Sequence, residues 1–128
     1  MKTVGIGVDI VDNNRIKSLI RNKTFIKRTF SQKEIIISKK YSNKLNFFSK
    51  RFAAKESFVK ALGTGFRNNL NFRDIEIIND KLGKPLYLIN LKIKKKIKKK
   101  KKINKFELFL SISDEKDYSI AFTIIQKI

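Results

Sequence analysis

The chain has 128 residues, 41% of them hydrophobic, which suits one domain over residues 1–128 with a single core. It contains neither cysteine nor histidine, which excludes disulfides, thiolate or imidazole metal sites, and histidine catalysis. Basic residues outnumber acidic ones by 31 to 11, and the net charge of +20 predicts attraction to polyanions: nucleic acid, a phosphorylated cofactor or an acidic protein.

No segment approaches the roughly 20 apolar residues that a membrane span needs. The first residues alternate like a strand and lack the basic and then apolar pattern of a signal peptide. The sequence therefore predicts a cytoplasmic protein without membrane contact.

Residues 4–10 alternate with the period of a strand that buries one face. We expect the buried face to consist of Val4, Ile6, Val8 and Ile10. The other face carries only hydrogens at Gly5 and Gly7, so a helix or a ligand can approach the backbone closely there. Asp9 is the first functional group on that face. Taken alone, the glycines are equally explained by tight packing.

Two helices are predicted next. Asp12 or Asn13 can cap the first of them. Its inward residues would be Ile16, Leu19 and Ile20. The second helix begins at Ser31, because Ser31 and Glu34 can satisfy each other's exposed backbone donors in a capping box.

A longer helix is predicted over residues 47–62, and the Gly-Thr-Gly sequence at 63–65 ends it. Its inward stripe would consist of Ala54, Phe58, Ala61 and Leu62. Glu56, Lys60 and Gly63 follow at spacings of four and three residues, which places them on one face. An ordinary surface ion pair, worth ~0.3 kcal/mol, is an alternative explanation for Glu56 and Lys60.

The C-terminal half predicts strands at 75–78 and 86–89, joined by a turn at 80–85. A hairpin closes the chain. We expect its apolar residues to pair with each other: Phe106, Leu108, Leu110 and Ile112 with Tyr118, Ile120, Phe122 and Ile124. The fold class predicted from these elements is α+β, with an antiparallel sheet packed against the long helix.

Nine lysines lie between Lys92 and Lys102, with Ile93 and Ile97 one helical turn apart. Nucleic acid bound by this run would be held in a strongly salt-dependent way. Base reading or stacking needs aromatic, Asn, Gln or Arg side chains among the charges, and the run has none. We therefore expect only nonspecific nucleic-acid binding, and a solvated helix face enriched in lysine by AT-rich codons explains the run as well.

Two segments resemble the signatures of a known family. They are GIGVDI at 5–10, followed by Arg15, and RFAAKESFVKALGTG at 51–65. Both are similar to motifs of the bacterial holo-acyl-carrier-protein synthases, the short class of 4'-phosphopantetheinyl transferases, and they occur in the expected order. The LGKP turn at 82–85, the length and the closing hairpin also fit, so the resemblance extends over essentially the whole chain.

The resemblance implies transfer of the phosphopantetheine arm of coenzyme A to a serine of apo-acyl carrier protein, releasing adenosine 3',5'-bisphosphate, in support of fatty acid biosynthesis. It implies Mg²⁺ held by Asp9 and Glu56, because splitting a diphosphate suits a hard cation with oxygen ligands. Glu56 would accept the serine proton, directly or through a metal-bound water, and Lys60 would offset charge on the leaving group. The expected coenzyme A contacts are Lys55, Lys60, Gly63, Thr64, Gly65, Lys84, Pro85 and Ser111.

The resemblance also implies that Arg15 and Arg21 bind the acidic carrier. It implies a homotrimer with active sites at subunit junctions, where the 83–85 turn and the hairpin would lie. One residue departs from the family: Phe109 stands where its members usually carry histidine. Two alternatives remain: a basic nucleic-acid-binding module without catalysis, and an inactive homologue, which the missing histidine favours.

Overall fold

The computed structural model describes residues 1–64 and 70–128. In chain order its elements are β1 (Lys2–Asp12), α1 (Asn13–Leu19), α2 (Lys23–Thr29), α3 (Gln32–Ser38), α4 (Lys44–Leu62), the 3-10 helix η1 (Phe72–Asp74), β2 (Glu76–Asn79), β3 (Pro85–Leu88), α5 (Leu91–Lys101), β4 (Phe106–Asp114) and β5 (Tyr118–Lys127).

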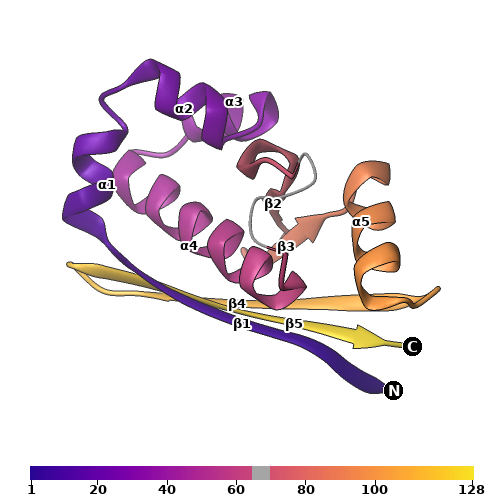
Figure 1. The fold of residues 1–128 in the computed structure, drawn as a ribbon. Coiled ribbons are helices and arrows are strands. Elements are labelled where there is room, and N and C mark those ends of the chain that lie inside the picture. Colours follow the sequence, from indigo (N-terminus) through magenta and orange to yellow (C-terminus); the bar gives the residue numbers. More distant parts are fainter. Residues whose placement is uncertain (65–69) are drawn as a thin grey trace.

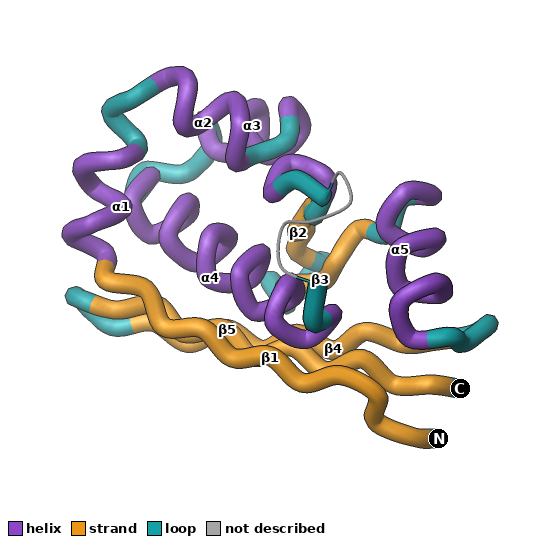
Figure 2. Tube along the Cα trace, viewed as in Figure 1, coloured by secondary structure: helices purple, strands orange, loops and turns teal. Residues whose placement is uncertain are grey.

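The architecture is a sheet covered on one face by helices. Strands β1, β5 and β4 form an antiparallel sheet in that order, and β2 and β3 form a separate antiparallel pair. Helix α4 lies on one face of the sheet, and α1, α2 and α3 lie on the far side of α4 (Figures 1 and 2). The predicted α+β fold, with an antiparallel sheet packed on a long helix, is confirmed.

Helix α4 is the centre of the core. It begins at Lys44, three residues before the predicted start, because the Asn43 side chain caps the backbone N–H of Asn46. It ends where expected, at Gly63, whose φ of 84° is a left-handed conformation that favours glycine. The predicted inward residues are all buried, along with most of the other side chains of α4. A helix buried on nearly all sides is typical of one that is covered by both a sheet and other helices.

Strand β1 corrects the first prediction, because its glycine face packs inward. A Cβ atom on Gly5 or Gly7 would collide with the backbone carbonyl of Ala61 or Ser57 of α4. The bare backbone thus lets the helix approach closely, and the apolar face is turned away from it. Ile6, Val8 and Ile10 are 60%, 53% and 61% exposed, so their predicted burial is wrong, whereas Val4 is partly buried against the core.

The closing hairpin also differs from the prediction in register. Its two apolar faces do not pair: Leu110 lies opposite Thr123, and Phe122 lies opposite Ser111. The reason is again α4, against which β5 turns its small residues Ser119, Ala121 and Thr123. The Thr123 hydroxyl hydrogen-bonds the hydroxyl of Ser57 on α4, with 2.6 Å between the oxygens.

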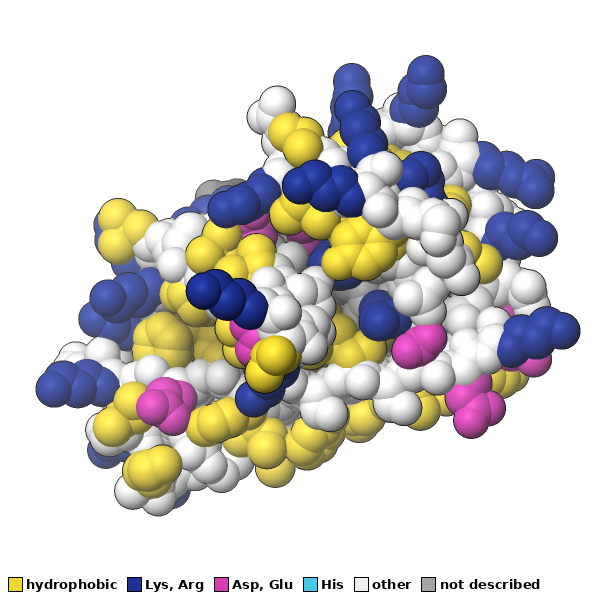
Figure 3. All heavy atoms as spheres, turned by 180° about the vertical axis from the view of Figure 1, so that it is seen from behind, with side chains coloured by type: hydrophobic (Ala, Val, Ile, Leu, Met, Phe, Trp, Pro, Cys, Tyr) yellow, Lys and Arg dark blue, Asp and Glu magenta, His cyan; other side chains and the backbone are white. Residues whose placement is uncertain are grey.

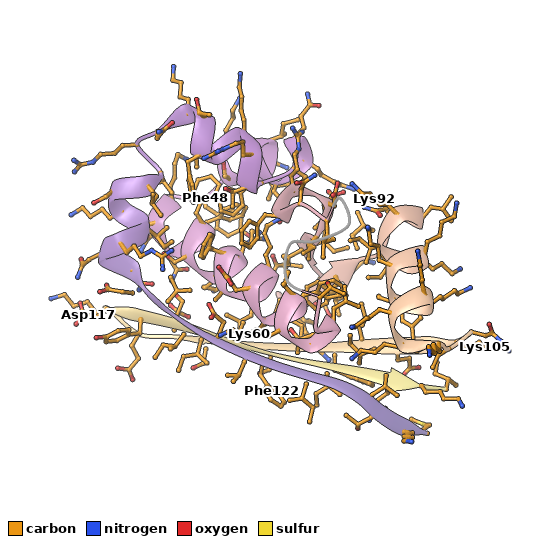
Figure 4. All side chains as sticks on the ribbon, in the orientation of Figure 1. Phe48, Lys60, Lys92, Lys105, Asp117 and Phe122 are labelled. Carbon is orange, nitrogen blue, oxygen red and sulfur yellow. The ribbon has the colours of Figure 1, made fainter. Side chains whose placement is uncertain are left out.

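These two corrections leave one apolar sheet face uncovered, which we call the outer face. Its exposed apolar residues are Ile6, Val8, Ile10, Phe109, Ile120 and Phe122. Yellow side chains line the sheet edge of the molecule in Figure 3, and Figure 4 shows Phe122 projecting from the sheet on the side away from α4.

The remaining elements lie close to their predicted places. The capping box at Ser31 and Glu34 is present, and β2 and β3 are each displaced by one residue from the prediction. Helix α2 was not predicted, although Asn22 supplies the capping oxygen that begins it. Ile93 and Ile97 are buried and fasten α5 to the core. Within the described residues, no helix combines the length and the apolar character that a membrane crossing requires.

Candidate active site

Asp9 and Glu56 come together where β1 crosses α4. Asp9 lies on the inward face of β1, two residues after Gly7, and Glu56 lies half-buried on α4. The Lys60 ammonium donates a hydrogen bond to Oδ1 of Asp9 at 2.9 Å. Figure 4 shows Lys60 between α4 and β1. Among the described residues Lys60 pairs with Asp9, from a different element, and not with Glu56, so the alternative of an ordinary Glu56–Lys60 surface ion pair does not hold.

The environment of Glu56 disfavours its charged form. Burial raises the pKa of Glu56 above its ordinary value, and the neighbouring Asp9 carboxylate raises it further. Lys60 and Arg15 oppose these effects only in part. A half-buried carboxylate beside a second carboxylate from another element is an arrangement typical of sites that bind a cation or a proton.

The two carboxylates suit Mg²⁺, which shares its ligands with substrate and water, better than they suit a metal ion bound entirely by protein side chains. Among the described residues, no group of three or more His, Cys, Asp or Glu side chains is placed to hold an ion. Asp9 and Glu56 supply two hard oxygen ligands. Mg²⁺ is commonly held by one or two carboxylates together with substrate phosphates and water, so two carboxylates suffice.

A groove of ≈ 480 Å³ leads to Glu56, and we call it the entry groove. Its walls come from α1, α2, α4 and the segment around η1: Arg15, Leu19, Phe25, Arg28, Thr29, Phe52, Glu56, Leu70, Asn71 and Phe72. The Arg15 guanidinium lies 5.9 Å from the centre of the Phe52 ring. The groove therefore combines apolar walls, two arginines and one carboxylate.

The structure separates the two arginines predicted to bind the carrier. Arg15 lines the entry groove, whereas Arg21 is exposed just beyond the end of α1 and does not line it. Arg28 of α2 takes the place beside Arg15, and the sequence prediction missed it because α2 was missed. The Asn22 cap was the available signal.

A second hollow of ≈ 170 Å³ lies by the 83–85 turn, and we call it the turn pocket. It is lined by Tyr41, Asn46, Phe47, Lys50, Arg51, Ile77, Asn79, Gly83, Pro85 and Ile112. The Arg51 guanidinium lies 3.6 Å from the Phe47 ring centre and donates to Oδ1 of Asn79 at 2.6 Å. Its Nε has no hydrogen-bond partner in the described residues. Arg51 was not predicted to be a site residue, although it is the first residue of the RFAAKE segment.

The position of Lys55 corrects the role that was predicted for it. It was predicted to contact coenzyme A, but its side chain is fully buried. Its ammonium donates to Oε1 of Glu34 at 2.7 Å, to the Phe72 carbonyl at 2.9 Å and to the Ile75 carbonyl at 2.5 Å. All three N–H groups are therefore used within the protein. Burial of the ammonium lowers the pKa of Lys55, and Glu34 opposes that effect.

The other predicted coenzyme residues lie in separate places. Gly63 caps α4 and Thr64 follows it, whereas Gly65 lies outside the described residues. Pro85 lines the turn pocket, and Lys84 is exposed beside it. Ser111 is exposed on β4, opposite Phe122 in the ladder, so it belongs to the outer face together with Phe109.

Comparisons with known proteins agree with this geometry. The model of the 4'-phosphopantetheinyl transferase superfamily matches residues 5–123. The chain is 62% identical to a holo-[acyl-carrier-protein] synthase of Pelagibacter ubique (strain HTCC1062), with 99% of each covered. Its structure resembles the holo-[acyl-carrier-protein] synthase of Neisseria meningitidis, with a TM-score of 0.86 and 37% identity over 98% of this chain and 99% of the other. A Bacillus anthracis synthase in complex with CoA (3',5'-ADP) gives a TM-score of 0.82 and 32% identity over the whole of both chains.

Proposed function

Since the chain belongs to the 4'-phosphopantetheinyl transferase superfamily, among the holo-[acyl-carrier-protein] synthases, we propose that it modifies an apo-acyl carrier protein. A serine hydroxyl of the carrier attacks the phosphorus that bears the pantetheine arm of coenzyme A. The new P–O bond forms as the bond to the second phosphate breaks, and adenosine 3',5'-bisphosphate leaves. The observation that carries this proposal is the meeting of Asp9, Glu56 and Lys60 between β1 and α4.

Asp9 and Glu56 would hold Mg²⁺. Bound there, the ion would neutralise the charge of the diphosphate and stabilise the negative charge that develops during the transfer. The side chain of Lys60 is 54% exposed, so its ammonium can turn from Asp9 toward an incoming phosphate. It would then offset the charge that develops on the leaving group.

Glu56 would also receive the proton of the attacking serine. Without the ion, burial first and Asp9 second raise the pKa of Glu56, so its carboxylate takes up a proton more readily than an ordinary surface carboxylate. It opens directly onto the entry groove, where a carrier serine can reach it.

The same pKa shift predicts pH-dependent Mg²⁺ affinity. Glu56 must lose its proton to bind the ion, and its pKa is raised, so falling pH should weaken Mg²⁺ binding earlier than for an ordinary carboxylate pair. Calorimetric titration with Mg²⁺ from mildly acidic to neutral pH would measure this. The same titration of Glu56→Gln is the control, in which Mg²⁺ binding should be weak at every pH. Affinity that stays constant over this range in the parent would contradict the role of Glu56.

We assign carrier binding to the entry groove. Acyl carrier proteins are acidic, and Arg15 and Arg28 line the same groove as Glu56. Leu19, Phe25 and Phe52 add apolar surface to this groove. A carrier helix that pairs with the arginines would therefore present its serine close to Glu56.

Reversing the charge of Arg15 tests this assignment. Arg15→Glu is expected to raise the KM for the carrier about tenfold, with a much smaller effect on the KM for coenzyme A. Steady-state kinetics against each substrate would measure both values. Lys33→Glu, an exposed position on α3, is the matched control for the loss of charge. Equal effects of both variants on the KM for the carrier would contradict a local contact.

We further propose that three copies associate through the outer face. Its exposed apolar side chains are more extensive than scattered surface residues require. Ser111 shares this face, and Pro85 lies in a hollow separate from that of Glu56, so one chain does not gather all the expected coenzyme contacts. In a trimer, Ser111 and Pro85 of one chain would lie next to Glu56 of a neighbouring chain.

A charge on the outer face tests the assembly. The parent is expected to sediment at three times the chain mass of 15.0 kDa, and Phe122→Lys at the mass of one chain with transfer strongly reduced. Ile36→Lys is a control, because Ile36 is 54% exposed but lies on α3. A monomeric parent that transfers at full rate would refute the trimer.

One experiment distinguishes the proposed transferase from its rivals. The protein is mixed with apo-carrier, coenzyme A and Mg²⁺, and the carrier is weighed by mass spectrometry. We expect the carrier to gain one phosphopantetheine group. An unchanged mass would favour the nucleic-acid-binding module or an inactive homologue. The cytoplasmic location stays a prediction.

A further inference from the structure

We propose that α5 is a second binding surface, separate from the catalytic groove, for the phosphodiester backbone of double-stranded nucleic acid. Nine lysines lie in the eleven residues from 92 to 102, and α5 itself ends at Lys101. Figure 4 shows side chains of α5 extending away from the rest of the molecule. The catalytic proposal makes no use of these residues.

The density of charge matches the proposed partner. A helix rises about 1.5 Å per residue, so this run carries one positive charge per about 1.8 Å of its length. Double-stranded DNA carries one negative charge per about 1.7 Å of its axis. The lysine run and a duplex can therefore lie alongside each other with nearly equal and opposite charge density.

The lysines are largely uncompensated within the protein. In the described part of the chain, Lys92 is the one α5 lysine with a carboxylate partner, at 2.7 Å from Asp74. Lysines four residues apart repel each other, and the pairs within α5 are Lys92 with Lys96, Lys94 with Lys98, Lys95 with Lys99, and Lys96 with Lys100. Ile93 and Ile97 hold the helix in place despite this repulsion. A polyanion that relieves it should stabilise the fold.

A hollow beside α5 is suited to bind phosphate groups. It has a volume of ≈ 590 Å³, and lysines from two segments face it: Lys94 and Lys98 of α5, and Lys105 just before β4. The Asn104 amide lies on the same wall, and Phe106 and Ile128 form the apolar side. Three ammonium groups around one hollow suit a run of phosphates better than a single carboxylate.

The composition of the surface selects among polyanions. Its two isoleucines are turned into the core, so α5 has no amphipathic apolar face to insert into a lipid surface. Lysine is depleted in the centres of protein interfaces, and α5 has no aromatic anchor for a protein partner. The run contains no arginine, asparagine or glutamine to read bases, so binding should be independent of sequence.

Anisotropy of a fluorescent 20-base-pair duplex, titrated with full-length protein at several salt concentrations, tests the proposal. Changing Lys94, Lys95, Lys98 and Lys99 together to Gln is expected to weaken binding more than tenfold and to reduce the salt slope by about three. The matched control changes four exposed lysines elsewhere, Lys17, Lys23, Lys27 and Lys33, to Gln, and should lose less than threefold. The duplex should also raise the melting temperature of the parent and not that of the α5 variant.

Equal losses in the two variants would overturn the proposal, because net charge alone would then explain binding. Binding of the parent to phosphatidylserine vesicles that is stronger than binding to the duplex, and that is lost in the α5 variant, would also overturn it. The α5 variant should keep carrier modification, so this outcome is independent of the transferase assay.

Discussion

Replacing Glu56 by glutamine is expected to lower kcat for phosphopantetheine transfer by about 10²–10⁴-fold. The change removes the group that would accept the serine proton and one of the two oxygens that would hold Mg²⁺. Stopped-flow mixing with apo-carrier and coenzyme A, with the products weighed over time, would measure the loss. Asp9→Asn should cost a similar factor, and the double variant little more, because the two residues act on one ion.

The fold is expected to survive this substitution and even to gain stability. The raised pKa of Glu56 means that its charged form is disfavoured in the folded state, by burial first and by Asp9 second. The penalty therefore applies at pH values above the raised pKa, and glutamine removes it. Denaturant unfolding near neutral pH would show an equal or higher midpoint for Glu56→Gln. A midpoint well below that of the parent would show that lost activity reflects lost structure.

The second large effect is expected at Lys55. Changing Lys55 to methionine should lower the free energy of unfolding by about 3–5 kcal/mol, because it leaves the buried Glu34 carboxylate without its cation. Two backbone carbonyls, of Phe72 and Ile75, would lose the ammonium as their donor. The measurement is the midpoint of denaturant unfolding.

A double variant separates charge from packing. In Glu34→Gln with Lys55→Met, the amide oxygen can still accept from the backbone N–H of Ser31 or Ile77, which Glu34 accepts from now. No uncompensated charge is then buried, so the double variant should be more stable than Lys55→Met alone. If the double variant is no more stable than the single one, the penalty is not electrostatic.

Motif position alone does not reveal what Lys55 does. The sequence places it beside Glu56 in a segment that resembles a catalytic signature, which led to the prediction of a coenzyme contact. Adjacent helix residues point about 100° apart, so Glu56 reaches the entry groove while Lys55 points into the core. Only the packing of α3, η1 and β2 around α4 shows that the lysine is structural.

The sequence by itself determined most of the elements, though not α2, and it singled out Asp9 and Glu56 within their two motifs. Local signals were sufficient for this: the capping box at Ser31, the glycine that ends α4, the spacing of Glu56 and Lys60, and the glycine face that carries Asp9. Each of these depends on residues within a few positions of one another, so they are visible without a fold.

The tertiary structure alone decided which side of each strand is inside. Alternation in β1 and β5 shows that two faces differ, but not which one meets the long helix. The backbone of α4 approaches Gly5 and Gly7 so closely that no side chain fits between. Ile6, Val8 and Ile10 of β1 and Ile120 and Phe122 of β5 therefore point outward, while Ile125 of β5 stays in the core. The joining of Arg15 and Arg28 in one groove, and the burial of Lys55, likewise depend on contacts between segments far apart in the chain.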